Sequence, residues 1–403
     1  MKTQLAGVAL FAATVSAIAL YPAVQSRAGA TPMQPIAHTA PPAAVAPSGT
    51  PRIDVVFALD TTSSMSGFIA AAKEKIWSIA TTMASAQPAP EIRIGLVAFR
   101  DRGDAYVTRV IDLSADLDSV YAQLMDFEAQ GGGDGPESVN QALYDAVHRV
   151  SWSSGDDTYK VIFLVGDAPP HMDYPNDVPY PTTIALAAQR GIRVNTIQSG
   201  ADATTARAWQ AIAALNQGEF FNVAAGGDAV AVTTPFDDQI ATLSRELDET
   251  RLFFGDGDDK ARQRRKLAAT DKVHAFASSA SRARRAAFNA SASGAGNFLG
   301  EKELVDAVVS GKLDLDRIPE AELPATLQAL PQEERHGVIA ARAEKREQLR
   351  ARIADLAGAR DAYIAAEVEA DGGAAASLDH KLYATVKDQA AAAGLSYDAA
   401  PKY

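Results

Sequence analysis

Two different patterns of apolar and polar positions alternate along the chain between Ile53 and about Asp248. Short β-branched and apolar runs predict strands, and stretches with apolar residues at spacings of three and four predict helices. The predicted strands begin at Ile53, Glu91, Ala105, Tyr159, Ile192 and Glu219. The predicted helices span residues 67–85, 115–127, 137–150, 182–190, 203–216 and 235–250.

The order and polarity of these segments predict a sheet covered by helices. The strands that contain Val55, Gly95 and Val161 are almost continuously apolar, as expected for parallel strands buried on both faces. Only residues 100–104 separate the second and third strands, so this pair is expected to be antiparallel and to lie at one edge. We expect an α/β fold with a doubly wound, mostly parallel six-stranded sheet in the order 3-2-1-4-5-6.

The pattern changes beyond Thr250, where alternating charges and alanine predominate and no run is typical of a buried strand. This change predicts an all-α C-terminal region over residues 251–403. Short helices there are expected to break at Gly311, Pro319 and Pro324. A long helix is predicted to follow, from about residue 333 to residue 370.

Two features of the C-terminal region bear on partners. The long helix has a narrow apolar seam formed by Leu349, Ile353, Leu356 and Tyr363. The seam either packs within the helical region or receives a partner helix. The basic clusters at residues 262–266 and 282–285 are interpreted as solvated helix faces, with binding of anionic cell-surface polymers as the alternative.

The N-terminus predicts export. Lys2 precedes an apolar run from Leu5 to Tyr21, and Ala28-Gly29-Ala30 is a small-residue cleavage site. Either residues 1–30 are a signal peptide that is removed, or the apolar run remains as a membrane anchor. Residues 31–51 are rich in Pro, Ala, Thr and Ser, which predicts an extended linker. We therefore expect folded regions at 52–250 and 251–403, both outside the cytoplasm, in the periplasm or secreted.

The composition of the chain disfavours or excludes several classes of function. The 403-residue chain has a net charge of −12, which disfavours nucleic acid as a partner because phosphate binding depends on Lys and Arg. It has no cysteine, so disulfides, thiolate catalysis and sulfur-ligated metals are excluded. Membrane contact is expected only if the N-terminal segment stays uncleaved. Oligomeric state is left open.

Polar residues lie directly after two neighbouring predicted strands and within one loop that comes between those strands in the sequence. Asp60, Thr62 and Ser64 form D-x-T-x-S after the first strand, and Asp167 follows the Tyr159 strand. The loop at residues 130–138 supplies Asp134, and its glycines are expected to allow a close approach. Because ligands bind at the carboxyl ends of the strands, where the strand order reverses, these side chains are expected to meet at one edge.

Oxygen ligands at this edge favour a hard cation. Carboxylates that converge without a basic neighbour repel one another unless a cation lies between them or some of them are protonated. Carboxylates and hydroxyls suit Mg²⁺, with Mn²⁺ or Ca²⁺ as alternatives. We therefore predict a metal site at Asp60, Thr62, Ser64, Asp134 and Asp167. Asp101 and His171 are expected to order their own loops or to join the site.

These motifs resemble the von Willebrand factor type A domain, whose metal-ion-dependent adhesion site has a D-x-S-x-S loop, a Thr or Asp in a second loop and an Asp in a third. Asp60, Thr62 and Ser64 match the first loop with one Thr-for-Ser exchange, and Asp167 matches the third. DTTSSM, AFRDRGD, GGGDGPE and GDAPPH together resemble the branch found in hemicentins and beside some α-kinases. The resemblance covers residues 53–250 and implies metal-dependent binding of an acidic side chain on a protein partner.

One departure from the adhesive members concerns the charge at the metal. The second loop offers Asp134 where these members often have Thr. A direct carboxylate ligand tightens metal binding but lowers the positive charge left for a partner's carboxylate. If Asp134 binds through water, the ion keeps an exchangeable position for that carboxylate.

Two functions of different class follow. In the first, the chain is an exported, non-enzymatic protein that engages a protein partner through the metal site. In the second, the site is structural or empty and the C-terminal helices bind the partner. A phosphatase of the haloacid dehalogenase type is a remote alternative, because Thr62 stands where such an enzyme has its acidic second Asp. No catalytic residue is predicted.

Overall fold

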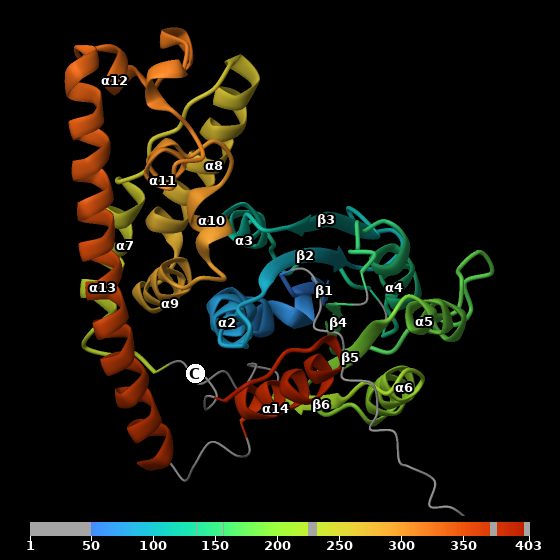
Figure 1. The fold of residues 1–403 in the computed structure, drawn as a ribbon. Coiled ribbons are helices and arrows are strands. Elements are labelled where there is room, and N and C mark those ends of the chain that lie inside the picture. The colour runs from blue at the N-terminus through green and yellow to red at the C-terminus, as the bar shows by residue number, and fades with distance from the viewer. Residues whose placement is uncertain (1–49, 134, 156, 225–231, 371–376, 399–403) are drawn as a thin grey trace, which may run out of the picture. The chain divides into compact units, whose positions relative to one another are not determined.

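The computed structural model describes residues 50–133, 135–155, 157–224, 232–370 and 377–398. A six-stranded sheet has the order β3-β2-β1-β4-β5-β6 (Figure 1), which confirms the predicted topology. Its strands are β1 Arg52–Asp60, β2 Glu91–Phe99, β3 Thr108–Ser114, β4 Thr158–Gly166, β5 Ile192–Ser199 and β6 Phe220–Val223. Every neighbouring pair is parallel except β2 and β3, which form the predicted antiparallel pair at the edge.

One group of helices lies between the strands or directly after the last strand, and a second group forms the rest of the described chain. The first group is α2 Ser66–Ala84, α3 Leu117–Leu124, α4 Val139–His148, α5 Tyr180–Gln189, α6 Ala203–Ala214 and α7 Asp237–Asp248. The second group is α8 Gly257–Phe276, α9 Ser279–Ala290, α10 Ala295–Leu299, α11 Leu304–Val309, α12 Ala325–Gln328, α13 Gln332–Ala370 and α14 Leu378–Ala390. Single 3₁₀ turns span Ser63–Met65, Leu315–Arg317, Glu320–Glu322 and Ala391–Ala393.

Helices bury both faces of the sheet, which explains why the central strands are so apolar. Alternate residues of β1 point to opposite faces, so that Val55 joins one core and Val56 the other. The Val55 core includes side chains of α2, α3 and α14. The Val56 core includes side chains of α4, α5 and α6. The central position of β1 places its carboxyl end in the middle of one sheet edge.

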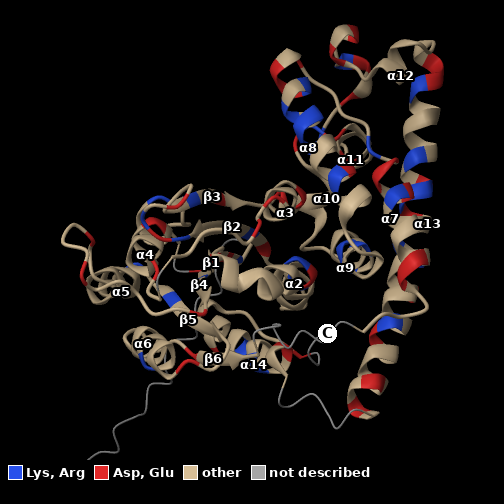
Figure 2. Cartoon of the chain, turned by 180° about the vertical axis from the view of Figure 1, so that it is seen from behind, with Lys and Arg blue, Asp and Glu red and all other residues tan. Residues whose placement is uncertain are grey.

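The helix that follows β6 does not cover the sheet. Helix α7 packs on α9 and α13 instead, and Ile240 of α7 shares a core with Ile353 of α13. Three of the four residues of the predicted α13 seam are therefore covered within the helical region, since Leu349 and Leu356 belong to the same core as Ile353. The fourth, Tyr363, is 37% exposed. Charges of both signs lie along α13 (Figure 2).

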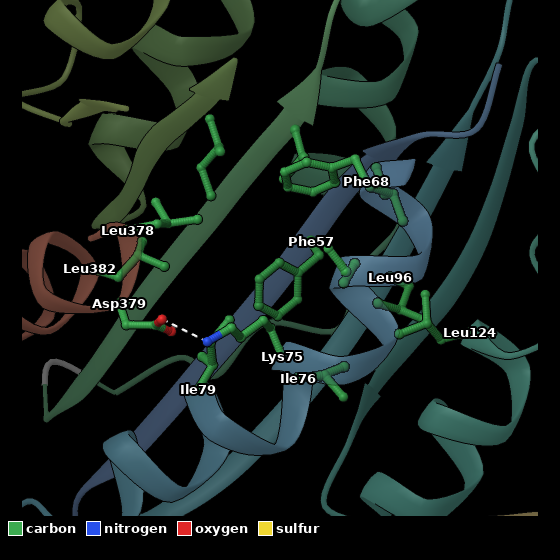
Figure 3. Close-up of a pocket in the computed structure, with 15 residues that line it drawn as sticks. Phe57, Phe68, Lys75, Ile76, Ile79, Leu96, Leu124, Leu378, Asp379 and Leu382 are labelled. Atoms are coloured by element: carbon green, nitrogen blue, oxygen red, sulfur yellow. Dashed lines mark hydrogen bonds and ion pairs between the residues drawn. The ribbon is translucent and has the colours of Figure 1, made fainter. Parts of the chain in front are cut away.

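The sheet face beside α2 is completed by the end of the chain. Leu382 and Val386 of α14 join the core that contains Val55. A cavity of about 60 Å³ remains between α2, the sheet and α14, with an almost entirely apolar lining (Figure 3). At its edge, Lys75 of α2 forms a buried ion pair with Asp379 of α14, with a distance of 2.6 Å between Nζ and Oδ2. Residues from opposite ends of the folded chain thus close one core.

The prediction that the basic clusters are solvated helix faces is wrong for several of their members. Arg285 of α9 is fully buried, and its guanidinium donates to Asp118 of α3 and to Asp248 of α7. Lys266 of α8 is also buried and pairs with Asp116 at 2.8 Å. These side chains join the helical region to the sheet through α3, a contact that local charge patterning does not reveal.

Candidate metal-binding site

The first loop brings the side chains of D-x-T-x-S together at the end of β1. Asp60 is fully buried, and its Oδ1 accepts hydrogen bonds from the backbone N–H of Thr62 at 2.9 Å and from the Thr62 hydroxyl at 2.6 Å. The Thr62 and Ser64 hydroxyl oxygens are 3.3 Å apart. The other carboxylate oxygen, Asp60 Oδ2, is buried without a hydrogen-bond partner.

The chain after β1 folds tightly because an apolar anchor follows the polar loop. Met65 is fully buried and ends the 3₁₀ turn that leads into α2. Thr61 donates its hydroxyl hydrogen bond to the Phe99 carbonyl oxygen at 2.9 Å, which fixes the loop to the end of β2. The buried Met65 side chain and the hydrogen bond to β2 thus fix the two ends of the loop.

The second loop lies against the first through its glycines. Gly131 accepts hydrogen bonds from the backbone N–H of Ser63 at 3.2 Å and from its hydroxyl at 2.8 Å. Gly131 and Gly132 have φ angles of +79° and +80°, and a Cβ on Gly132 would lie 3.2 Å from the Thr62 Cβ. Only glycine suits this approach. Asp134, the ligand predicted from this loop, lies outside the described residues.

Glu137 is the acidic residue of the second loop that the structure places at the site. It is 3% exposed, and its Oε2 is buried without a hydrogen-bond partner. Its backbone is fixed by the third loop, because Glu137 N–H donates to Pro169 at 2.9 Å and Glu137 C=O accepts from His171 N–H at 3.0 Å. Sequence reasoning missed Glu137 because it assigned this residue to the first turn of a helix, whereas α4 begins at Val139.

The third loop begins with Gly166 and Asp167. A Cβ on Gly166 would lie 3.1 Å from Asp60 Oδ2, so glycine leaves the free carboxylate oxygen its space. Asp167 is half-buried, and its carbonyl oxygen accepts a 3.1 Å hydrogen bond from the Thr205 hydroxyl. Its charge acts on both Asp60 and Glu137.

Burial and neighbouring carboxylates raise the pKa of both buried carboxyl groups at the site. Burial raises the pKa of Asp60 to about 7, against the hydrogen bonds from Thr62, and the charge of Asp167 adds to the rise. Burial also raises the pKa of Glu137 to about 9, together with the charges of Asp60, Asp101, Asp104 and Asp167. A positive charge nearby would favour the ionised form of both groups.

Asp101 and His171 form a second cluster beside the site. Asp101 accepts hydrogen bonds from the hydroxyls of Ser138 at 2.8 Å and Tyr174 at 2.7 Å. His171 Nδ1 lies 2.8 Å from Asp173 Oδ1, and its Nε2 lies 3.4 Å from Asp101 Oδ2. These contacts order the loops around the site.

The residues present fit a hard cation. Asp60 Oδ2 and Glu137 Oε2 are buried acceptors without donors, and buried polar groups ordinarily have partners. Arg100, buried at the same edge, donates to the Thr61 and Glu128 carbonyl oxygens rather than to these carboxylates. Among the described residues, no three Asp, Glu or His side chains are arranged as a metal site by themselves. A cation here would therefore also need the hydroxyls of the first loop.

Comparison with known families identifies the sheet-bearing part of the chain. A family model described as von Willebrand factor A domain matches residues 54–234. Residues 54–234 form a von Willebrand factor A domain. Such A domains commonly carry a metal-ion-dependent adhesion site and are usually binding modules without catalysis. The match identifies no branch of the family.

Solved A domains show only distant likeness to this one. The chain is 16% identical to BatB from Bacteroides thetaiotaomicron, covering 43% of this chain and 90% of that one with a TM-score of 0.33. The SpRpn10 A domain is 13% identical over 45% of this chain and 94% of that one, with a TM-score of 0.35. Proximal thread matrix protein 1 from the mussel byssus, in a structure with a zinc-occupied adhesion-site motif, is 16% identical over 43% of this chain and 42% of that one, with a TM-score of 0.34. Scores this low support no inference about function.

Two further comparisons bear on the chain as a whole. No curated protein matches it. Within the part of the chain that the structure describes, no helix is both long and apolar enough to span a bilayer.

Proposed function

We propose that the protein is an exported, non-enzymatic binding protein that holds a divalent cation at the carboxyl edge of its A domain and uses it to engage a protein partner. The observation that supports this best is the buried Asp60 carboxylate, which is bonded on one oxygen to Thr62 and has no partner on the other. A cation is the species that completes such an arrangement.

The proposed ligands come from all three loops. Asp60, Thr62, Ser64, Asp134 and Asp167 are the set expected from the sequence, and Glu137 is added because its orphaned oxygen lies in the same group of interacting carboxylates. Mg²⁺ is the proposed ion, with Mn²⁺ or Ca²⁺ as alternatives. When bound, the ion supplies a positive charge with an exchangeable position for a partner's carboxylate.

Several finer assignments belong to this proposal. The motifs DTTSSM, AFRDRGD, GGGDGPE and GDAPPH favour the branch found in hemicentins and beside some α-kinases. Residues 1–30 are proposed as an export signal or anchor, and residues 31–51 as a linker. With this export signal or anchor, the A domain, within 52–250, and the helical region, 251–403, lie outside the cytoplasm.

The competing functions have less support. A scaffold that binds its partner through the C-terminal helices would use the seam of α13, but Leu349, Ile353 and Leu356 are covered within the helical region. Phosphatase chemistry of the haloacid dehalogenase type would need an acid where Thr62 hydrogen-bonds to Asp60. A phosphate-release assay on the purified protein tests this last alternative.

Two neighbouring serines provide a matched test. Ser64 lies beside Thr62 in the proposed ligand set, whereas Ser63 donates to Gly131 on the other side of the loop. In calorimetric titration of the full chain with Mg²⁺, we expect Ser64→Ala and Glu137→Gln to weaken binding by about tenfold or more, because the first removes an oxygen ligand and the second removes the negative charge of a ligand. Ser63→Ala should change it much less. Equal effects of the two serine variants, or wild-type binding by Asp60→Ala, contradict the proposal.

A further inference from the structure

The loop after Asp167 exposes apolar side chains beside the proposed metal site. We call residues 168–179, between β4 and α5, the rim loop. Met172 is 57% exposed and Val178 is 36% exposed, and these are two of the seven exposed large apolar residues among those described. One exposed apolar residue is ordinary, whereas two on one short loop next to a ligand site indicate a contact surface.

Asn140 of α4 holds both ends of the exposed part of the rim loop. Its Nδ2 donates to the His171 carbonyl oxygen at 2.6 Å, and its Oδ1 accepts from the Tyr180 backbone N–H at 2.8 Å. The same Nδ2 lies 3.6 Å from the Met172 sulfur. Asn140 is 2% exposed and follows Glu137 by three positions, so Met172 is held at a fixed place beside the second loop.

An aromatic and cationic contact fixes the middle of the rim loop. The Arg102 guanidinium lies 4.0 Å from the centre of the Tyr174 ring and forms an ion pair with Asp177. The Tyr174 hydroxyl donates to Asp101 at 2.7 Å. Met172 and Val178 are therefore presented by an ordered loop, and an ordered contact loses little conformational entropy when a partner binds.

Charge determines what kind of partner fits this surface. Asp60, Glu137 and Asp167 make the centre acidic, and Arg102 at the rim is already paired with Asp177, so that a bound cation is what attracts an anion here. Met172 and Val178 offer apolar area at the same rim. A partner that satisfies both features brings a carboxylate to the cation and an apolar side chain to the rim loop.

We propose that the rim loop is a specificity surface of the A domain, and that its partner is an exposed protein segment with an Asp or Glu next to an apolar residue. The carboxylate binds the cation, and the apolar side chain packs on Met172 and Val178. This inference rests on the proposed function, since the cation must be present for the carboxylate to bind.

A random peptide library displayed on phage tests this proposal. The full chain is immobilised with Mg²⁺, and bound phage are eluted with chelator, so that only cation-dependent peptides are recovered. We expect these peptides to be enriched in an acidic residue with an apolar neighbour. Met172→Ser and Val178→Ser should each weaken a selected peptide by about fivefold to tenfold, the size typical of losing a well-packed apolar contact.

Matched variants separate a contact from a folding defect. Leu215→Ser changes a side chain that is 49% exposed at the end of α6, away from the rim loop, and should leave peptide affinity unchanged. Replacing the peptide's apolar residue by Ala should reproduce the loss seen with Met172→Ser, and the two changes together should cost little more than either alone.

The possible outcomes distinguish the two proposals. Acidic peptides without an apolar preference, or serine variants at residues 172 and 178 that bind as tightly as the wild type, overturn the specificity surface and leave metal-dependent binding in place. Recovery of no Mg²⁺-dependent peptide overturns both. Enrichment of the acidic and apolar pair with loss on Met172→Ser supports both.

Discussion

At the scale of single residues, the proposed function rests on two buried carboxyl groups, Asp60 and Glu137, each with one oxygen that has no hydrogen-bond partner. Burial raises the pKa of Asp60 to about 7 and that of Glu137 to about 9, with neighbouring carboxylates adding to both shifts. In the unfolded chain these groups ionise near pH 4. The folded, metal-free protein therefore binds more protons than the unfolded chain above about pH 4, and its stability decreases as pH rises.

This linkage predicts an interaction between pH and metal. We expect the Tm of the metal-free protein to fall between roughly pH 5 and pH 9, and the increase in Tm caused by excess Mg²⁺ to grow over the same interval, because the ion displaces the protons. Thermal unfolding with chelator and with Mg²⁺ measures both. The Asp60→Asn, Glu137→Gln double variant is the control and should show no Mg²⁺ effect. A Mg²⁺ effect that is constant with pH would contradict the assignment.

At the scale of elements, the notable arrangement is that α14 takes a place on the sheet that α7 leaves open. Helix α7 packs on α9 and α13, whereas Leu382 and Val386 of α14 complete the core beside α2. The ion pair between Lys75 and Asp379 is buried at this contact (Figure 3). The helix that follows the D-x-T-x-S loop, α2, is thus held in place by α14.

Breaking this pair should destabilise the protein. We expect Asp379→Ala to lower the free energy of unfolding by about 3 to 5 kcal/mol, because it leaves the Lys75 ammonium buried without its carboxylate. Chemical denaturation measures this difference. Asp388→Ala, which removes an exposed carboxylate from the same helix, should change stability by less than about 0.5 kcal/mol. A loss of equal size in both variants would show that the buried pair is not what fixes α14.

At the scale of the whole molecule, a buried charge network joins the A domain to the helical region. Arg285 of α9 pairs with Asp118 of α3 at 2.6 Å and with Asp248 of α7 at 2.7 Å. Burial alone would raise the pKa of Asp118, but Arg285 outweighs it and the pKa falls to about 2. A carboxylate with a depressed pKa stabilises the fold above its unfolded pKa, and this contribution disappears as the pH falls from about 4 towards 2.

Removing Arg285 should weaken this connection. We expect Arg285→Met to lower the free energy of unfolding by at least about 3 kcal/mol, because Asp118 remains buried without the guanidinium that pairs with it. Scanning calorimetry should show a lower Tm and separate transitions where the wild type shows one. Arg264→Ala changes an exposed arginine of α8 and should leave the thermogram unaltered. A single, unshifted transition in Arg285→Met would exclude this network as the connection.

The sequence predicted what local patterns determine. Apolar runs and the short link between β2 and β3 were sufficient for the strand order, and this order places Asp60, at the end of β1, in the middle of one sheet edge. Glu137 was missed because its place at the site depends on hydrogen bonds to the distant residues Pro169 and His171. Arg285 was misassigned because its partners are 167 and 37 residues away.

The element against which α14 packs was not predicted, for a similar reason. Its amphipathic pattern predicts a buried face but does not say against which element that face packs. The contact that orients the helix, from Asp379 to Lys75, spans 304 residues. Non-local contacts of this kind determine the site's surroundings more than the motifs themselves.

The most direct test of the metal site is a crystal structure of the full chain grown with Mn²⁺, with anomalous scattering recorded to locate the ion. We predict one strong anomalous peak among Asp60 Oδ2, the Thr62 and Ser64 hydroxyls and Glu137 Oε2, with ligand distances of about 2.0 to 2.3 Å. Crystals of Asp60→Ala should lack it. The absence of a peak at this edge of the wild-type sheet, with Mn²⁺ bound elsewhere, would contradict the central claim.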